Sequence, residues 1–64
     1  MEQNKKKRAL VIDDEEPMRE YVTFGLEQAG YRVDACRDGA EGLKKFYKHR
    51  FDIVVTDIVM PGKD

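Results

Sequence analysis

The chain has 64 residues, which is enough for one domain, and a domain of this size buries only about 60% of the surface that its unfolded form exposes. Its 12 basic and 13 acidic side chains give a net charge of -1, so the surface is mixed in charge and we expect no nucleic-acid partner. The single cysteine excludes an intramolecular disulfide, and no apolar run approaches the roughly 18–20 residues that span a membrane, so we expect a cytoplasmic protein with no membrane partner.

A basic leader precedes the first predicted element. Residues 1–8 are polar, lack the apolar core of a signal peptide and end in the basic run Lys5–Arg8. Such a run can contact nucleic acid or anionic lipid, but its position directly before a strand favours a solvated, charged approach to the fold. We therefore predict a leader over 1–8 and one folded domain over 9–64.

The first two predicted elements are a strand and a helix. Ala9–Ile12 is a continuous apolar run between charged residues, which is typical of a strand covered on both faces, as in a parallel sheet. Pro17 suits the first position of the helix that follows, because its missing N–H would be unpaired there. Spacings of three and four predict one apolar stripe, formed by Met18, Tyr21, Val22, Gly25, Leu26 and Ala29. Gly30 follows where a left-handed helix cap is favoured.

A second strand, a second helix and a third strand complete the pattern. Tyr31–Cys36 alternates loosely between apolar and charged residues, which is typical of a half-exposed edge strand. Asp38 followed by Glu41 resembles a capping box and predicts the start of a helix. The apolar face of this helix is predicted to consist of Ala40, Leu43, Phe46 and Tyr47. Phe51–Thr56 is rich in β-branched residues and predicts the third strand.

The order β-α-β-α-β predicts an α/β fold with a parallel sheet, because strands that alternate with helices are joined by right-handed crossovers. We expect the first strand at the centre, the strand order 2-1-3 and one helix on each face. Ligands of such sheets bind beyond the carboxyl ends of the strands, where the direction of winding reverses. Asp13, Asp14 and Asp57 end the first and third strands and are predicted to meet there.

These three carboxylates indicate a site for a divalent cation, since they would repel one another without one. Oxygen ligands with few protein donors suit Mg²⁺. A paired-carboxylate hydrolase is a second interpretation, but it needs a deeper cleft than so short a chain can build. A third is that the aspartates only form turns, which the matching position of Asp57 disfavours.

Several motifs resemble those of response regulator receiver domains. Leu10–Glu15 ends a strand in acidic residues and is followed by Arg19. Gly30-Tyr31 and Asp38-Gly39 lie between elements, and Asp52–Gly62 contains the pattern Asp-x-x-Met-Pro. The resemblance covers nearly the whole chain after the leader and implies the flavodoxin-like fold of a receiver.

The resemblance also implies roles for four residues in phosphorelay signalling. Asp57 matches the phosphoacceptor, which takes a phosphoryl group from a histidine kinase. Asp14 matches a direct Mg²⁺ ligand, and Asp13 matches an acidic neighbour that binds the metal mainly through water. Asp57 and the backbone carbonyl of Val59 complete the implied metal ligands. We therefore expect a signalling domain and not an enzyme.

An enzymatic alternative is the dehalogenase-like phosphatase class, which also uses a strand-end aspartate nucleophile and Mg²⁺. That class needs a second acid two residues after the nucleophile, where this chain has Val59. The alternative is therefore disfavoured.

By the same resemblance, the chain holds the first half of a receiver and is truncated after the third strand. In the family, a later strand carries a Ser or Thr that contacts the phosphoryl oxygens, and the last strand carries a Lys that pairs with them. We therefore expect impaired phosphotransfer and a weakened Mg²⁺ site.

Self-association is the other expectation that follows from a half-receiver. The outer edge of Phe51–Thr56 would present unpaired backbone groups on an apolar strand, which favours association. We expect a symmetric homodimer that pairs this strand antiparallel with its copy, and exchange of elements between chains is the alternative. A homodimeric interaction module without phosphorelay activity is accordingly the second functional hypothesis.

Overall fold

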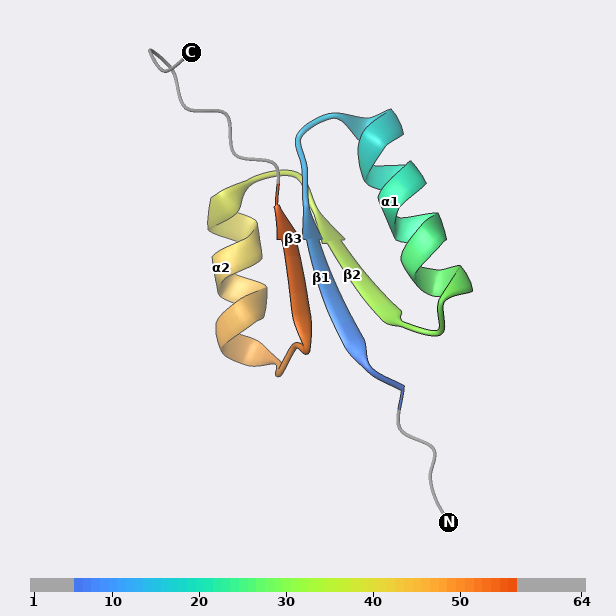
Figure 1. Cartoon of the computed structure of the whole chain (residues 1–64). Helices are drawn as coiled ribbons and strands as arrows, with labels where there is room; N and C mark the ends of the chain where they lie inside the picture. Colours follow the sequence, from blue (N-terminus) through green and yellow to red (C-terminus); the bar gives the residue numbers. More distant parts are fainter. Residues whose placement is uncertain (1–5, 57–64) are drawn as a thin grey trace.

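Two helices flank a three-stranded sheet in the computed structural model, which describes residues 6–56 (Figure 1). The elements in chain order are β1 (Arg8–Ile12), α1 (Glu16–Gln28), β2 (Arg32–Cys36), α2 (Gly39–Lys48) and β3 (Ile53–Thr56). This order confirms the predicted β-α-β-α-β pattern.

β1 lies at the centre of the sheet and pairs in parallel with both neighbours. The strand order is β2-β1-β3, as predicted. Ile12, the last residue of β1, lies opposite Cys36 in β2 and opposite Thr56 in β3. The three strands therefore end at the same level, and the residues that follow β1 emerge at the carboxyl edge of the sheet.

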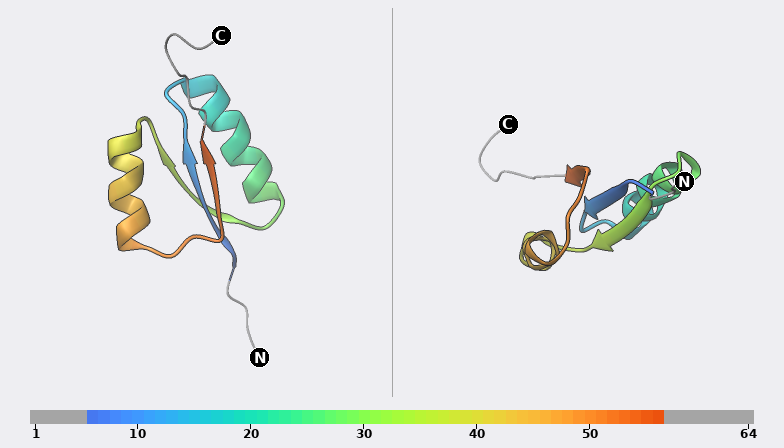
Figure 2. Two further views of the ribbon diagram at one scale, coloured as in Figure 1. Left: turned by 60° about the vertical axis from the view of Figure 1, so that its left-hand side comes forward. Right: turned by 90° about the horizontal axis from the view of Figure 1, so that it is seen from below.

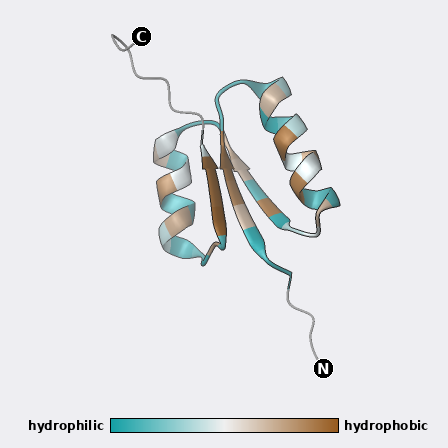
Figure 3. Cartoon of the chain, in the orientation of Figure 1, coloured by the Kyte–Doolittle hydropathy of each residue, from teal (hydrophilic) through white to brown (hydrophobic). Residues whose placement is uncertain are grey.

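The helices α1 and α2 cover opposite faces of the sheet, as expected (Figure 2). Apolar residues gather along β1 and β3, whereas both helices alternate between apolar and polar residues (Figure 3). The buried apolar core consists of Ala9, Leu10 and Val11 in β1 and Cys36 in β2. Within residues 6–56, neither helix is long and apolar enough to cross a membrane.

The apolar stripe predicted for α1 is wrong in part. Met18 and Tyr21 are 47% and 76% exposed, and no residue of α1 is fully buried. The half-buried residues of this helix are Arg19, Val22, Thr23 and Leu26. The packed face is therefore rotated from the predicted one, because contact with the sheet, and not the apolar spacing alone, selects which face of a helix packs.

Helix starts and stops follow the predicted local signals. Pro17 lies in the first turn of α1, and Gly30 beyond its end has φ = 97°, a left-handed conformation that glycine adopts without strain. At α2, the Asp38 carboxylate accepts a hydrogen bond of 2.8 Å from the N–H of Glu41. The Glu41 carboxylate accepts in turn, at 3.5 Å, from the N–H of Arg37. Such a cap stabilises a helix by about 1 kcal/mol.

Close packing of α2 against β1 depends on Gly42. This residue is buried, and a Cβ added to it would lie 2.8 Å from Cγ1 of Ile12 and closer still to Cδ1. The missing side chain therefore lets α2 approach the last residue of β1. The residues predicted on the apolar face of α2 are all exposed: Ala40, Leu43, Phe46 and Tyr47. Leu43 and Phe46 line an open apolar groove beside Gly42, and Gly42 alone is buried in this helix.

The amino end of the sheet is held by what we call the Arg8 cluster: Arg8, Asp34, Lys45, Phe51 and Asp52. The Asp52 carboxylate accepts a hydrogen bond of 2.7 Å from the N–H of Arg8. β3 begins directly after Asp52, two residues later than predicted. The Arg8 guanidinium lies 3.4 Å from the Asp34 carboxylate and 5.4 Å from the centre of the Phe51 ring. Lys45 lies 3.6 Å from Asp34 and joins α2 to the cluster.

Candidate functional site

Asp13 directly follows β1 and is held at the carboxyl edge of the sheet. Its N–H donates to the Cys36 carbonyl at 3.1 Å, which extends the pairing of β1 with β2 by one residue. Its carboxylate accepts a hydrogen bond of 3.0 Å from the N–H of Glu15, which closes a tight turn. The residue is only 6% exposed. The side chain therefore occupies a fixed position at the predicted edge.

Arg19 reaches back from α1 to the same turn. One of its guanidinium N–H groups donates to the carbonyl oxygen of Asp13 at 2.9 Å, and the residue is half-buried. Sequence reasoning noted Arg19 only as part of a motif and did not identify this contact. The available signal was a basic residue one turn into a helix whose start is acidic.

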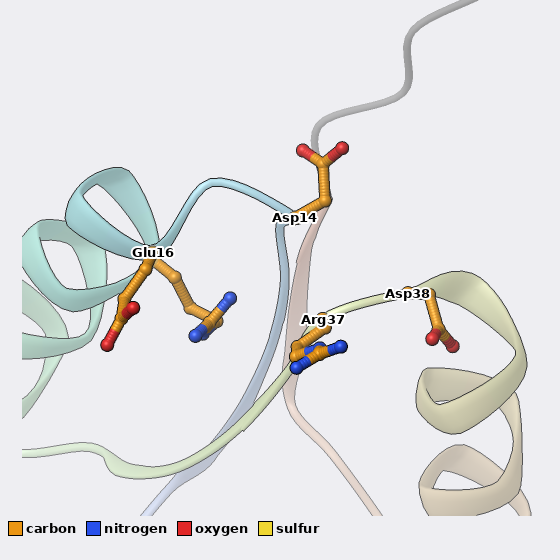
Figure 4. Close-up of a pocket in the computed structure, with 5 residues that line it drawn as sticks. Asp14, Glu16, Arg37 and Asp38 are labelled. Atoms are coloured by element: carbon orange, nitrogen blue, oxygen red, sulfur yellow. The ribbon is translucent and has the colours of Figure 1, made fainter.

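Asp14 lies at the rim of a recess of about 300 Å³, which is lined by Asp14, Glu16, Arg19, Arg37 and Asp38. Asp14 is exposed, and its carboxylate points outward, away from the guanidinium group of Arg37 (Figure 4). The two neighbouring aspartates thus differ: Asp13 is buried and bonded within its turn, whereas Asp14 faces solvent.

The chemistry of this pair suits a hard cation. Asp13 and Asp14 present carboxylate oxygens at one edge, and an exposed carboxylate suits Mg²⁺ because that ion keeps several of its waters. The other predicted ligands, Asp57 and the carbonyl of Val59, lie outside the described residues. Within residues 6–56, no three His, Cys, Asp or Glu side chains are arranged to hold a metal. A complete metal site would therefore require ligands beyond this range.

Cys36 ends β2 beside Asp13 and is only 2% exposed. Burial raises the pKa of its thiol above the ordinary value of 9.0, and the Glu41 carboxylate raises this pKa further, while Lys45 opposes them. The thiol is therefore protonated at neutral pH and packs as a small apolar group.

A parallel sheet in the order β2-β1-β3, with carboxylates directly after its central strand, defines a flavodoxin-like α/β protein. The family model of the response regulator receiver domain matches residues 9–64, and the chain belongs to this family. The resemblance seen in the sequence motifs is thereby confirmed.

Two known proteins illustrate what this chain is similar to. The transcriptional regulatory protein HprR of Escherichia coli (strain K12) is 40% identical over 57 residues, which are 89% of this chain and 26% of HprR. The structure of the chemotaxis response regulator CheY4 of Vibrio cholerae matches with a TM-score of 0.82 and 37% identity over 92% of this chain and 49% of CheY4.

A further match comes from the crystal structure of the histidine kinase ThkA in complex with the response regulator protein TrrA. Its TM-score is 0.77, with 46% identity over 88% of this chain and 48% of the matched chain. The chain thus spans about half the length of the solved chains that it matches and about a quarter of HprR.

Proposed function

We propose that this receiver domain accepts a phosphoryl group on Asp57 from a histidine kinase. Membership of the receiver family supports the proposal, as does the similarity to a structure that contains a kinase and a response regulator. The observation that carries it is the pair Asp13 and Asp14 at the end of the central strand, where a ligand-binding edge is expected.

The transfer requires one bond to break and one to form. The nitrogen–phosphorus bond of a phosphohistidine breaks as a carboxylate oxygen of Asp57 bonds to phosphorus, and the released imidazole takes up a proton. Asp14 would bind Mg²⁺ directly and Asp13 through water, with Asp57 and the Val59 carbonyl as the other ligands. When bound, Mg²⁺ neutralises charge on the group in transfer. The hydrogen bond that the Asp13 carboxylate accepts from the N–H of Glu15 would hold this side chain in place beside the ion.

We also propose that the 64-residue polypeptide, taken by itself, carries out this transfer poorly. In receivers, a Ser or Thr and a Lys on later strands contact the phosphoryl oxygens. Residues 1–64 alone would hold the same group with fewer donors, so its formation should be slow and its lifetime short.

Incubation of the chain with Mg²⁺ and acetyl phosphate, followed by measurement of the intact mass, tests both proposals. We expect a minor fraction of chains to gain one phosphoryl group and the Asp57→Asn variant to gain none. A stoichiometric, long-lived adduct would contradict impaired transfer. An adduct that persists in Asp57→Asn would contradict the assignment of the phosphoacceptor.

The kinase is tested separately as the donor. A histidine kinase, phosphorylated with labelled ATP and freed of nucleotide, should lose label to the chain and not to Asp57→Asn. Phosphorylation by acetyl phosphate without any transfer from a panel of kinases would remove the kinase part of the proposal.

A second candidate function is a homodimeric interaction module. β3 is an edge strand among the described residues, and Val54 on it is 42% exposed. Beside it lies an open apolar groove lined by Leu10, Ile12, Gly39, Gly42, Leu43, Phe46 and Val54. Antiparallel pairing of β3 with its copy would cover this edge without bringing like charges together, because Ile53–Thr56 carries none.

The mass of the chain in solution, measured by light scattering, tests this second function. We expect a dimer for the unmodified chain and a monomer for Val54→Lys. Tyr47→Lys adds the same charge at a residue that is 80% exposed on α2 and should leave the dimer intact. A folded monomer of the unmodified chain would refute dimerisation through β3.

A further inference from the structure

Two arginines, Arg19 and Arg37, line the recess beside Asp14. They come from different elements, since Arg19 belongs to α1 and Arg37 follows β2. The recess has a volume of about 300 Å³, which accommodates a small tetrahedral anion together with water.

Both guanidinium groups retain hydrogen-bond donors. Arg19 uses one N–H for the carbonyl oxygen of Asp13, which fixes its orientation, and a guanidinium group carries about five N–H donors in total. Arg37 is exposed. The ion pairs found within residues 6–56 join Arg8 and Lys45 to Asp34 and involve neither arginine of the recess.

The carboxylates around the recess do not occupy it. The Asp14 carboxylate points away from the guanidinium group of Arg37, and Glu16 lies across the recess from Arg37 (Figure 4). The Asp38 carboxylate is also engaged as the cap of α2, through its hydrogen bond of 2.8 Å with the N–H of Glu41. Within residues 6–56, none of these carboxylates forms an ion pair with Arg19 or Arg37, which leaves guanidinium donors available to a ligand.

Two helix starts flank the recess, whose lining has three carboxylates and two guanidinium groups. α1 begins at Glu16 and α2 begins at Gly39, and both residues flank or belong to the lining. The first N–H groups of a helix carry partial positive charge and favour anions. Guanidinium groups bind anions with several oxygens through two parallel hydrogen bonds, which favours a phosphate group over a simple halide.

We propose that Arg19 and Arg37 form a binding recess for a phosphate-type oxyanion next to the Asp13–Asp14 edge. The ligand is either free phosphate or the phosphate group of a donor that approaches Asp57. Only the second of these rests on the proposed function, because binding of free phosphate needs no phosphoryl transfer.

Titration with inorganic phosphate at constant ionic strength, followed by the amide NMR shifts of residues 37–39, tests the recess. We expect saturable shifts, and about fivefold weaker binding in Arg37→Gln, since a charge-assisted hydrogen bond is lost at an exposed site. Arg32→Gln is the matched control: this exposed residue of β2 lies opposite Arg8, at the other end of the sheet, and loses the same charge.

The outcomes separate a site from a general effect of charge. Equal weakening by Arg37→Gln and Arg32→Gln, or shifts that do not saturate, would overturn the recess. Arg37→Lys keeps the positive charge but loses the paired N–H donors of the guanidinium group. Its affinity for phosphate should therefore lie between those of the unmodified chain and Arg37→Gln. Affinity equal to that of Arg37→Gln would contradict a role for the charge of Arg37.

A second arm distinguishes the donor from free phosphate. With acetyl phosphate and Mg²⁺, Arg37→Gln should raise the KM for adduct formation on Asp57 and leave the maximal rate unchanged. An unchanged KM would limit the recess to free phosphate and overturn its role toward the donor. Phosphate binding that depends on Arg37, in a chain whose Asp57 takes no phosphoryl group, would support the recess and refute the proposed function.

Discussion

Arg8 and Arg37 lie at opposite ends of the sheet and differ in what their charges contact. Arg8 pairs with Asp34 at 3.4 Å and stacks on Phe51. Arg37 lines an open recess and forms no ion pair within residues 6–56. Asp14, beside it, is exposed as well.

The difference shows how a small sheet divides its charged residues between folding and binding. At the amino end, pairing joins β1, β2, α2 and the residue before β3 through side chains far apart in the sequence. At the carboxyl edge, Asp13 and Asp14 form no such pair with another residue of 6–56, which weakens the fold but leaves oxygen ligands and N–H donors for a ligand. Substitutions at each end of the sheet, and in α2 between the ends, test this division.

The largest loss of stability is expected for Gly42→Ala, in the helix that runs between the two ends. The new Cβ would collide with Ile12, and overpacking of this kind costs about 2 kcal/mol, partly offset by the better helix propensity of alanine. Urea unfolding followed by circular dichroism measures the loss. Ile12→Val removes the colliding Cδ1 and should restore part of the stability in the double variant. No restoration would show that the collision is not the cause.

A smaller loss is expected for Arg8→Met, which keeps the apolar stem but removes the guanidinium group. The ion pair and the contact with Phe51 together should contribute about 1 kcal/mol, while the backbone bonds to Asp52 remain. Arg37→Met is the matched change at the other end and should alter stability by less than about 0.5 kcal/mol. If urea unfolding showed the same loss of stability for Arg8→Met and Arg37→Met, the proposed difference between the two ends of the sheet would be wrong.

Asp14→Asn should stabilise the chain slightly in the absence of Mg²⁺. Removing one of two adjacent carboxylates relieves repulsion with Asp13, and at an exposed position we expect a gain of about 0.5 kcal/mol. Added Mg²⁺ should raise the melting temperature of the unmodified chain and not that of Asp14→Asn. The same rise in both would show that Asp14 does not bind the ion.

The smallest effect concerns pH and Cys36. Because burial raises the pKa of this thiol, the folded chain holds the proton more tightly than the unfolded chain. The resulting stability is fully present below the unfolded pKa of 9.0 and is lost as the pH rises through the folded value. The free energy of unfolding should therefore fall more steeply above pH 9.0 in the unmodified chain than in Cys36→Ala. Parallel curves would contradict this linkage.

The sequence predicted those features that depend on neighbouring residues. The apolar run of β1, the cap at Asp38 and the left-handed Gly30 are local signals, and each is confirmed. The hydrogen bond between Arg8 and Asp52 joins residues 44 positions apart, so no local sequence pattern predicts it. The face of α1 was also mispredicted, because exposed Tyr21 fits the apolar spacing as well as the half-buried Val22 does.

The candidate site divides in the same way. Asp13 and Asp14 were placed correctly at the carboxyl edge, since a strand end fixes where the next residues emerge. The recess arginines were not recognised as a pair, because they meet only when α1 and β2 are brought together. The roles of Asp57 and Val59, which lie outside the described residues, stay predictions.

The central position of β1 has a consequence for how the chain opens. Within residues 6–56, β1 alone is paired on both sides, and Ala9, Leu10 and Val11 are buried, whereas α1 buries no residue completely. Amide hydrogens of β1 should therefore exchange with solvent only when the whole domain unfolds, and those of α1 through smaller, more frequent openings. One exchange experiment would thus report global and partial unfolding separately, and would show which of the two a bound ion suppresses.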